Sequence, residues 1–110
     1  KVVNLPIFYS VLFFTIFITM KTMDIIFNNE DYYNSLIWDT DEWRQEHGLP
    51  KAKVIVSVME DNVDGINYYV VTVNETIFSY LMLREFGMSE KYGPEGWNQY
   101  IESSYNCQTA

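Results

Sequence analysis

The sequence predicts an α+β protein in which a single N-terminal transmembrane helix is followed by short helices, a β-hairpin and two C-terminal helices. Three observations predict this class. Residues 2–20 carry no charged side chain, residues 53–59 and 66–73 are rich in β-branched residues, and apolar residues recur at helical spacing after Asn74 and after Pro94. Helices and strands are therefore expected in separate parts of the chain.

The charge-free run of residues 2–20 predicts a membrane anchor. A helix of about 20 apolar residues spans the hydrocarbon of a bilayer. Polar side chains in this run, such as Tyr9 and Thr15, are scattered around the helix axis instead of gathering on one face. We assign residues 1–23 to a membrane-anchor helix and residues 24–110 to a small acidic α+β head. The anchor residues are Leu5, Ile7, Phe8, Val11, Leu12, Phe13, Phe14, Ile16, Phe17 and Ile18.

Two other interpretations of the apolar run stay open. A helix that is apolar on all sides can be enclosed by protein, but a chain of 110 residues has little mass with which to enclose it. A basic residue before a long apolar stretch is also typical of a secretory signal peptide, although residues 19–23 lack the small-residue cleavage pattern. Because the sequence begins with Lys1 and not Met, we expect a removed leader or a partial sequence.

Short helices are expected directly after the anchor. Residues 24–29 either continue the first helix or turn away from it. Asparagines precede residues 30–38, where apolar residues recur at a spacing of four, so a short helix is predicted there. A capping-box pattern begins at Asp39 and predicts a second short helix that ends at Gly48.

The middle of the head predicts a β-hairpin. Residues 53–59 and 66–73 are both rich in β-branched residues and alternate in the manner of strands. The polar residues 60–65 are predicted to connect them. Because an isolated hairpin is only marginally stable in water, we expect it to pack on helices or to join another sheet.

Two helices are predicted to complete the chain. Asn74 is a suitable N-cap for a helix that runs to Phe86 and ends at Gly87. The last helix is expected to begin at Pro94, because Pro is favoured in the first helical turn. Residues 106–110 are predicted to form a frayed tail.

The sequence contains no pattern that indicates catalysis or metal binding. Its only histidine, His47, and its only cysteine, Cys107, are far apart, which argues against a zinc tetrad and a Cys-His nucleophile pair. Residues 60–65 resemble the start of a calcium loop, but Val71 stands where such a loop needs a glutamate. We therefore predict a protein that is not an enzyme and has no catalytic residue, cofactor, metal ligand or small-molecule substrate.

Composition favours a protein partner. The formal net charge of −8 disfavours contact with nucleic acid, so no nucleic-acid partner is expected. Aromatic residues make up 17% of the chain, more than a small head needs for its own core, and Tyr and Trp are enriched at protein interfaces. The partner-interface candidates are Trp38, Trp43, Tyr68, Tyr69, Trp97 and Tyr100. The prediction is a non-catalytic, single-pass accessory subunit, anchored in the lipid bilayer, that stabilises a larger membrane protein complex.

One stretch resembles a known family. Residues 46–50, Glu-His-Gly-Leu-Pro, end an acidic, Trp-bearing helix that follows the predicted transmembrane helix. This pattern is similar to the small single-span ESSS accessory subunit of mitochondrial complex I. The hairpin and the last two helices have no counterpart in that pattern. The resemblance favours a respiratory-type complex, and with it the mitochondrial inner membrane.

Two rival functions stay open. In one, the chain is a soluble acidic inhibitor or adaptor of phage or mobile-element type, which imitates nucleic acid for a basic target. In the other, it is a small structural membrane protein of a virion. Residues 2–20 distinguish the membrane-anchored subunit from the first rival, because an inhibitor that mimics nucleic acid has no use for a lipid-facing helix.

Overall fold

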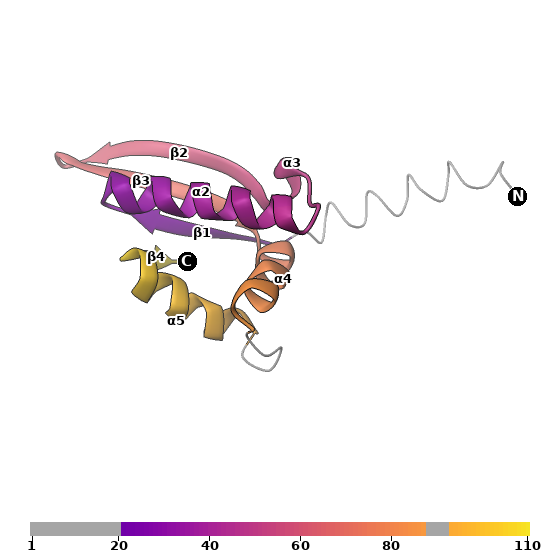
Figure 1. Cartoon of the computed structure of the whole chain (residues 1–110). Coiled ribbons are helices and arrows are strands. Elements are labelled where there is room, and N and C mark those ends of the chain that lie inside the picture. The colour runs from indigo at the N-terminus through magenta and orange to yellow at the C-terminus, as the bar shows by residue number, and fades with distance from the viewer. Residues whose placement is uncertain (1–20, 88–92) are drawn as a thin grey trace, which may run out of the picture.

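The computed structural model describes residues 21–87 and 93–110, with side chains from residue 96 in the second range. The predicted anchor residues, from Leu5 to Ile18, lie outside the described residues. Figure 1 shows the arrangement of the described elements. Their bounds are β1 (Thr22–Phe27), α2 (Glu30–Glu46), α3 (Lys51–Val54), β2 (Ile55–Val63), β3 (Ile66–Asn74), α4 (Glu75–Phe86), α5 (Gly93–Tyr105) and β4 (Gln108–Thr109).

The described residues form an α+β fold around a four-stranded antiparallel sheet in the order β2-β3-β1-β4. The predicted hairpin is confirmed as β2 and β3. A two-residue turn joins them, with Asp64 at φ 53° and Gly65 at φ 81°. Two consecutive positive φ angles are typical of the type I′ turn, whose twist matches that of the flanking strands.

Residues 22–27 form a strand, so of the two alternatives given for residues 24–29, continuation of the first helix is wrong. Strand β1 includes Thr22 and Met23, which the sequence analysis assigned to the anchor. It pairs with β3 on one side and with β4 on the other. Its alternate residues Ile25 and Phe27 have no exposed surface, so burial against the core stabilises the strand.

One helix, α2, replaces the two short helices predicted for residues 30–48. Asn29 caps it, because its side-chain oxygen accepts hydrogen bonds from the backbone N–H groups of Asp31 and Tyr32. The predicted second cap at Asp39 does not form. The Asp39 carboxylate instead accepts a hydrogen bond from the Tyr105 hydroxyl, so a tertiary contact uses the group that the local pattern assigned to a cap.

Strand β2 is shifted toward the C-terminus relative to its prediction. The short helix α3 takes up the first residues of the predicted strand, and the strand then continues through residues 60–63, which were predicted to be a connection. The register with β3 shifts between Ile55 and Ser57, which is typical of a β-bulge.

The C-terminal helices match their predictions, but the tail does not. Asn74 caps α4 through the backbone N–H of Ile77, and Gly87 ends it at φ 64°. Residues 108–109 form strand β4 instead of a frayed tail. Backbone hydrogen bonds of 3.0 and 2.9 Å join Asp24 and Ala110 in both directions, so the chain end completes the sheet.

The core lies between one face of the sheet and the helices. We call this face the inner face. It presents buried residues from β1 and β3, which pack against buried residues of α2, α4 and α5. Figure 1 shows α2 running along the strands, with α5 beside β4 and α4 at the end of the sheet where β3 leads into it. The core residues are Ile25, Phe27, Tyr33, Leu36, Tyr69, Val71, Val73, Phe78, Met82, Trp97, Ile101 and Tyr105.

Candidate interaction surface

The opposite face of the sheet carries an apolar patch. Side chains of paired antiparallel residues project to the same face, and their neighbours along each strand project to the other. Met59 pairs with Val70, and Val70 pairs with Ile26, so these three form a row across β2, β3 and β1. Val63 and Ile66 pair beside the turn. The outer patch is defined as Ile26, Met59, Val63, Ile66, Tyr68 and Val70.

Strand β2 is an edge strand, and the part of the outer patch on β2 and at the start of β3 is exposed. Among the described residues, β2 pairs with β3 alone. Met59 is 57% exposed, and Val63 and Ile66 are each 48% exposed. Exposed edges with apolar side chains are sites where proteins associate, and native proteins usually protect them with charge or a cover. The hairpin therefore presents an exposed apolar surface at the edge of the sheet.

Polar groups border the outer patch. On the side nearer Lys21, the Thr72 hydroxyl donates a hydrogen bond of 2.6 Å to the Asp24 carboxylate. Asp61, opposite Tyr68, borders the row through Met59 on the side nearer the turn. A pocket beside β4 joins Ile26 and Tyr68 of the patch to polar residues such as Gln108.

The structure removes two of the predicted interface residues from the surface. Tyr69 and Trp97 are only 9% and 2% exposed and belong to the core. Trp97 Nε1 donates a hydrogen bond of 2.6 Å to Ser79 Oγ, and its ring packs edge-to-face on Phe78. These two aromatic residues stabilise the head and are not available to a partner.

The other four predicted interface residues have different environments. Trp43 packs edge-to-face on Phe86, which also contacts Tyr100, so all three lie against the core. Tyr68 belongs to the outer patch. Trp38 is 73% exposed on α2, and that helix covers the inner face of the sheet. Trp38 and the outer patch therefore face away from each other.

Sequence reasoning missed Met59, Val63 and Ile66 as surface residues. The polar residues between Met59 and Val63 indicate a loop, which predicts that the first hairpin strand ends at Met59 and not at Val63. The pair Asp64-Gly65 was the available signal, because Asp-Gly is among the preferred sequences of a two-residue hairpin turn. Placing the turn there extends β2 and brings Val63 opposite Ile66.

Two polar groups near the chain end are held in their neutral forms. Burial and the adjoining Asp39 carboxylate raise the pKa of the Tyr105 hydroxyl far above its usual value. Burial raises the pKa of the Cys107 thiol to about 12, and Glu102 adds to this shift. Because the thiolate is the reactive form of cysteine, Cys107 is poorly suited to nucleophilic chemistry.

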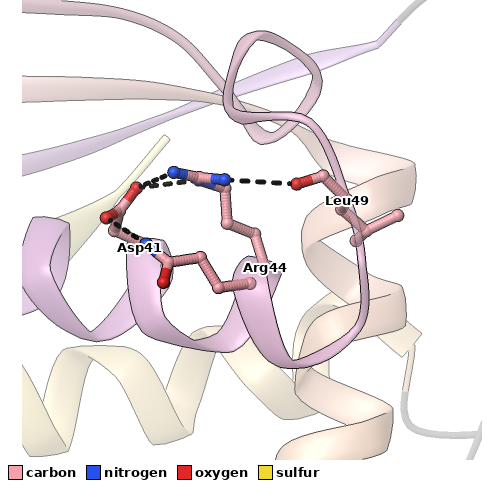
Figure 2. A network of polar contacts seen from close by, with 4 residues as sticks. Asp41, Arg44 and Leu49 are labelled. Atoms are coloured by element: carbon pink, nitrogen blue, oxygen red, sulfur yellow. Dashed lines mark hydrogen bonds and ion pairs between the residues drawn. The ribbon is translucent and has the colours of Figure 1, made fainter.

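The end of α2 carries a network of polar contacts and a cluster of possible metal ligands. Figure 2 shows Arg44 between the carboxylate of Asp41, at 2.7 Å, and the backbone oxygen of Leu49, at 3.4 Å. Beside this network, His47 Nε2 lies 2.9 Å from Glu85 Oε1 on α4. No metal ligand is predicted from the sequence. His47 and Glu85 are 38 residues apart in the chain, so no short metal-binding motif contains both.

Comparison with known proteins finds no matching family model, no matching curated protein and no matching solved structure. Within residues 21–87 and 93–110, no helix is both long enough and apolar enough to cross a membrane.

Proposed function

We propose that the protein is a non-catalytic, single-pass membrane-anchored accessory subunit that stabilises a larger membrane protein complex. The observation that carries this proposal is the charge-free run of residues 2–20, which is immediately followed by Lys21 and the first strand of the head. The outer patch supports it, because a subunit with a docking role needs an accessible apolar surface.

The connection at Lys21 defines which end of the sheet lies nearer the bilayer. Thr22 begins β1 and pairs with Asn74, whereas the turn at Asp64 and Gly65 lies at the far end of β3. With a rise of about 3.3 Å per residue, the row through Ile26 stands about 13 Å beyond Thr22 along the strand, and the turn about 30 Å. The partner surface is therefore extramembrane.

The side chains of the outer patch indicate what kind of partner surface would fit it. An apolar row that contains Met59 and is bordered by Asp24 and Asp61 fits an apolar patch with basic residues at its edge. The resemblance of residues 46–50 to the ESSS subunit favours a respiratory-type complex of the mitochondrial inner membrane. Both features support an integral complex with a basic extramembrane domain as the partner.

Alkaline carbonate extraction of native membranes, followed by native-gel separation of the detergent-solubilised chain, tests this function. Retention in the membrane pellet and migration in a large assembly are the expected results. Release as a small soluble species would contradict the proposal and would favour the acidic inhibitor. Migration as a small species after membrane retention would keep the anchor but contradict the accessory-subunit role.

Replacing Phe13 and Phe14 by Asp should release the chain from membranes. Two carboxylates at the centre of an apolar helix cost about 5 to 7 kcal/mol on the insertion scale, enough to abolish insertion. The matched control replaces Asn34 and Ser35, both exposed on α2, by Asp. The control adds the same charge and should stay in the carbonate pellet. Membrane retention of the Phe13→Asp/Phe14→Asp variant would rule out the anchor.

A further inference from the structure

Three side chains converge where the C-terminal ends of two helices meet. Glu46 is the last residue of α2, His47 is its C-cap, and Glu85 lies one residue before the end of α4. One possible ligand atom from each residue lies within 4.8 Å of the other two. His47 Nε2 and Glu85 Oε1 are 2.9 Å apart. We call these residues the helix-end triad.

The spacing of the helix-end triad fits a metal ion. Zinc binds imidazole nitrogen and carboxylate oxygen at about 2.1 Å, so two ligands in tetrahedral geometry lie about 3.4 Å apart. His47 Nε2 and Glu85 Oε1 are 2.9 Å apart, and ligand atoms of all three residues lie within 4.8 Å of one another, so this spacing is within reach of small side-chain movements. The ring of His47 packs edge-to-face on Tyr80, with centroids 6.2 Å apart, and this contact helps to orient it.

The electrostatics of the triad also favour a cation. Carboxylates are unfavourable at helix C-termini, where the helix dipole is negative, and Glu46 and Glu85 both occupy such positions. The two carboxylates also lie close enough to repel each other. A divalent ion between the two carboxylates would remove this repulsion.

The nearest arginines of the two helices make other contacts. Arg44 pairs with Asp41 at 2.7 Å and donates to the backbone of Leu49, as Figure 2 shows. The Arg84 guanidinium lies over the ring of Tyr80, 5.9 Å from its centroid. Glu85 Oε1 instead lies 2.9 Å from Nε2 of His47, a residue that can itself bind a metal ion.

We propose that Glu46, His47 and Glu85 form a binding site for one divalent transition-metal ion, and that Zn²⁺ fits it best. One imidazole nitrogen and two carboxylate oxygens are ligands that Zn²⁺ accepts, and they leave a fourth position for water. The ion would replace the contact between His47 and Glu85 and would join the end of α2 to the end of α4. Such a link stabilises the packing of the two helices in the head.

The test is equilibrium dialysis of the full, untagged chain in detergent against micromolar ZnCl₂, with thermal unfolding of the same samples. We expect one Zn²⁺ per chain and a rise in Tm of at least about 5 °C over the EDTA-treated protein. Mg²⁺ at the same concentration should not raise the Tm, because it prefers octahedral oxygen ligands. Absence of bound Zn²⁺, or equal effects of the two ions, would overturn the assignment.

Two variants locate the ion. His47→Gln and Glu85→Gln should each weaken Zn²⁺ binding at least tenfold, while circular dichroism shows that the fold remains. Glu75→Gln is the matched control, since it makes the same change at the other end of α4 and should leave binding unchanged. If all three variants bind Zn²⁺ as the unsubstituted chain does, the ion does not occupy the helix-end triad.

Discussion

At the residue scale, Tyr105 and Cys107 show how the chain end is fixed. The Tyr105 hydroxyl donates to Asp39 on α2, and Cys107 Sγ lies 3.5 Å from the backbone oxygen of Ile101. Both side chains are partly or wholly shielded from water. Burial disfavours the charged form of each group, which is why both titrate at higher pH than usual.

Cys107 should react slowly with thiol reagents. With its pKa raised to about 12, very little thiolate exists near neutral pH, and the folded chain restricts access to the sulfur. At pH 8 we expect modification by a disulfide reagent at least about tenfold slower than in the urea-unfolded chain. The rate of chromophore release measures this difference. Equal rates in both states would show that residues 106–110 are frayed after all.

At the element scale, β4 depends on a contact with the helix before it. The Glu102 carboxylate on α5 accepts hydrogen bonds from the Thr109 backbone N–H, at 3.0 Å, and from its hydroxyl, at 2.8 Å. These hydrogen bonds lower the pKa of Glu102 because they favour the ionised form. Two residues of strand alone would be too short to stay paired, so this carboxylate helps to hold β4 against β1.

Replacing Glu102 by Ala should loosen β4 without unfolding the head. At pH 7 we expect the hydrogen-exchange protection of the Thr109 amide to fall about fivefold, which corresponds to about 1 kcal/mol for a solvent-screened, charged hydrogen bond. Because the pKa of Glu102 is lower in the folded state, the contact stabilises β4 above the unfolded pKa of about 4.3 and is lost as pH falls through the folded value. The hydrogen-exchange protection of the Thr109 amide should therefore become equal in the unsubstituted chain and the variant at acidic pH. Unchanged protection at pH 7 would contradict this role.

Elements with local signals were predictable from the sequence, and elements that depend on distant residues were not. Helix α4 has a cap at Asn74 and a stop at Gly87, so its bounds follow from its own residues. Strand β1 lies between β3 and β4 in the sheet. Pairing with strands so distant in the sequence leaves no local pattern in the residues of β1 or β4. The interruption predicted at Asp39 is absent because its carboxylate meets Tyr105, 66 residues away.

The candidate surfaces also depend on residues that are distant in the sequence, so they could not be predicted from it. Aromatic content indicated a partner, but burial in the fold decides which aromatic residues can reach one: Trp97 is enclosed and Trp38 is exposed. The outer patch depends on the register of three strands, and the helix-end triad depends on two helices meeting. Neither juxtaposition is visible in a linear pattern.

At the scale of the whole molecule, the described residues place helices over one face of the sheet and none over the other. The inner face holds the core, and the outer face carries the apolar row through Met59. In the proposed function the chain makes two contacts: residues 2–20, which precede Lys21, with lipid, and the outer patch with a larger protein. Neither contact requires catalytic groups.

The most direct test of this account compares Met59→Lys with Val58→Lys in native membranes. The two residues are neighbours on the edge strand, 57% and 50% exposed, and their pairing partners place them on opposite faces of the sheet. Both variants should fold, since lysine is well tolerated on edge strands. On native gels, Met59→Lys should migrate apart from the large assembly, because a buried charge opposes docking, while Val58→Lys should stay within it. Retention of Met59→Lys in the assembly, or loss of Val58→Lys alone, would contradict docking through the outer patch.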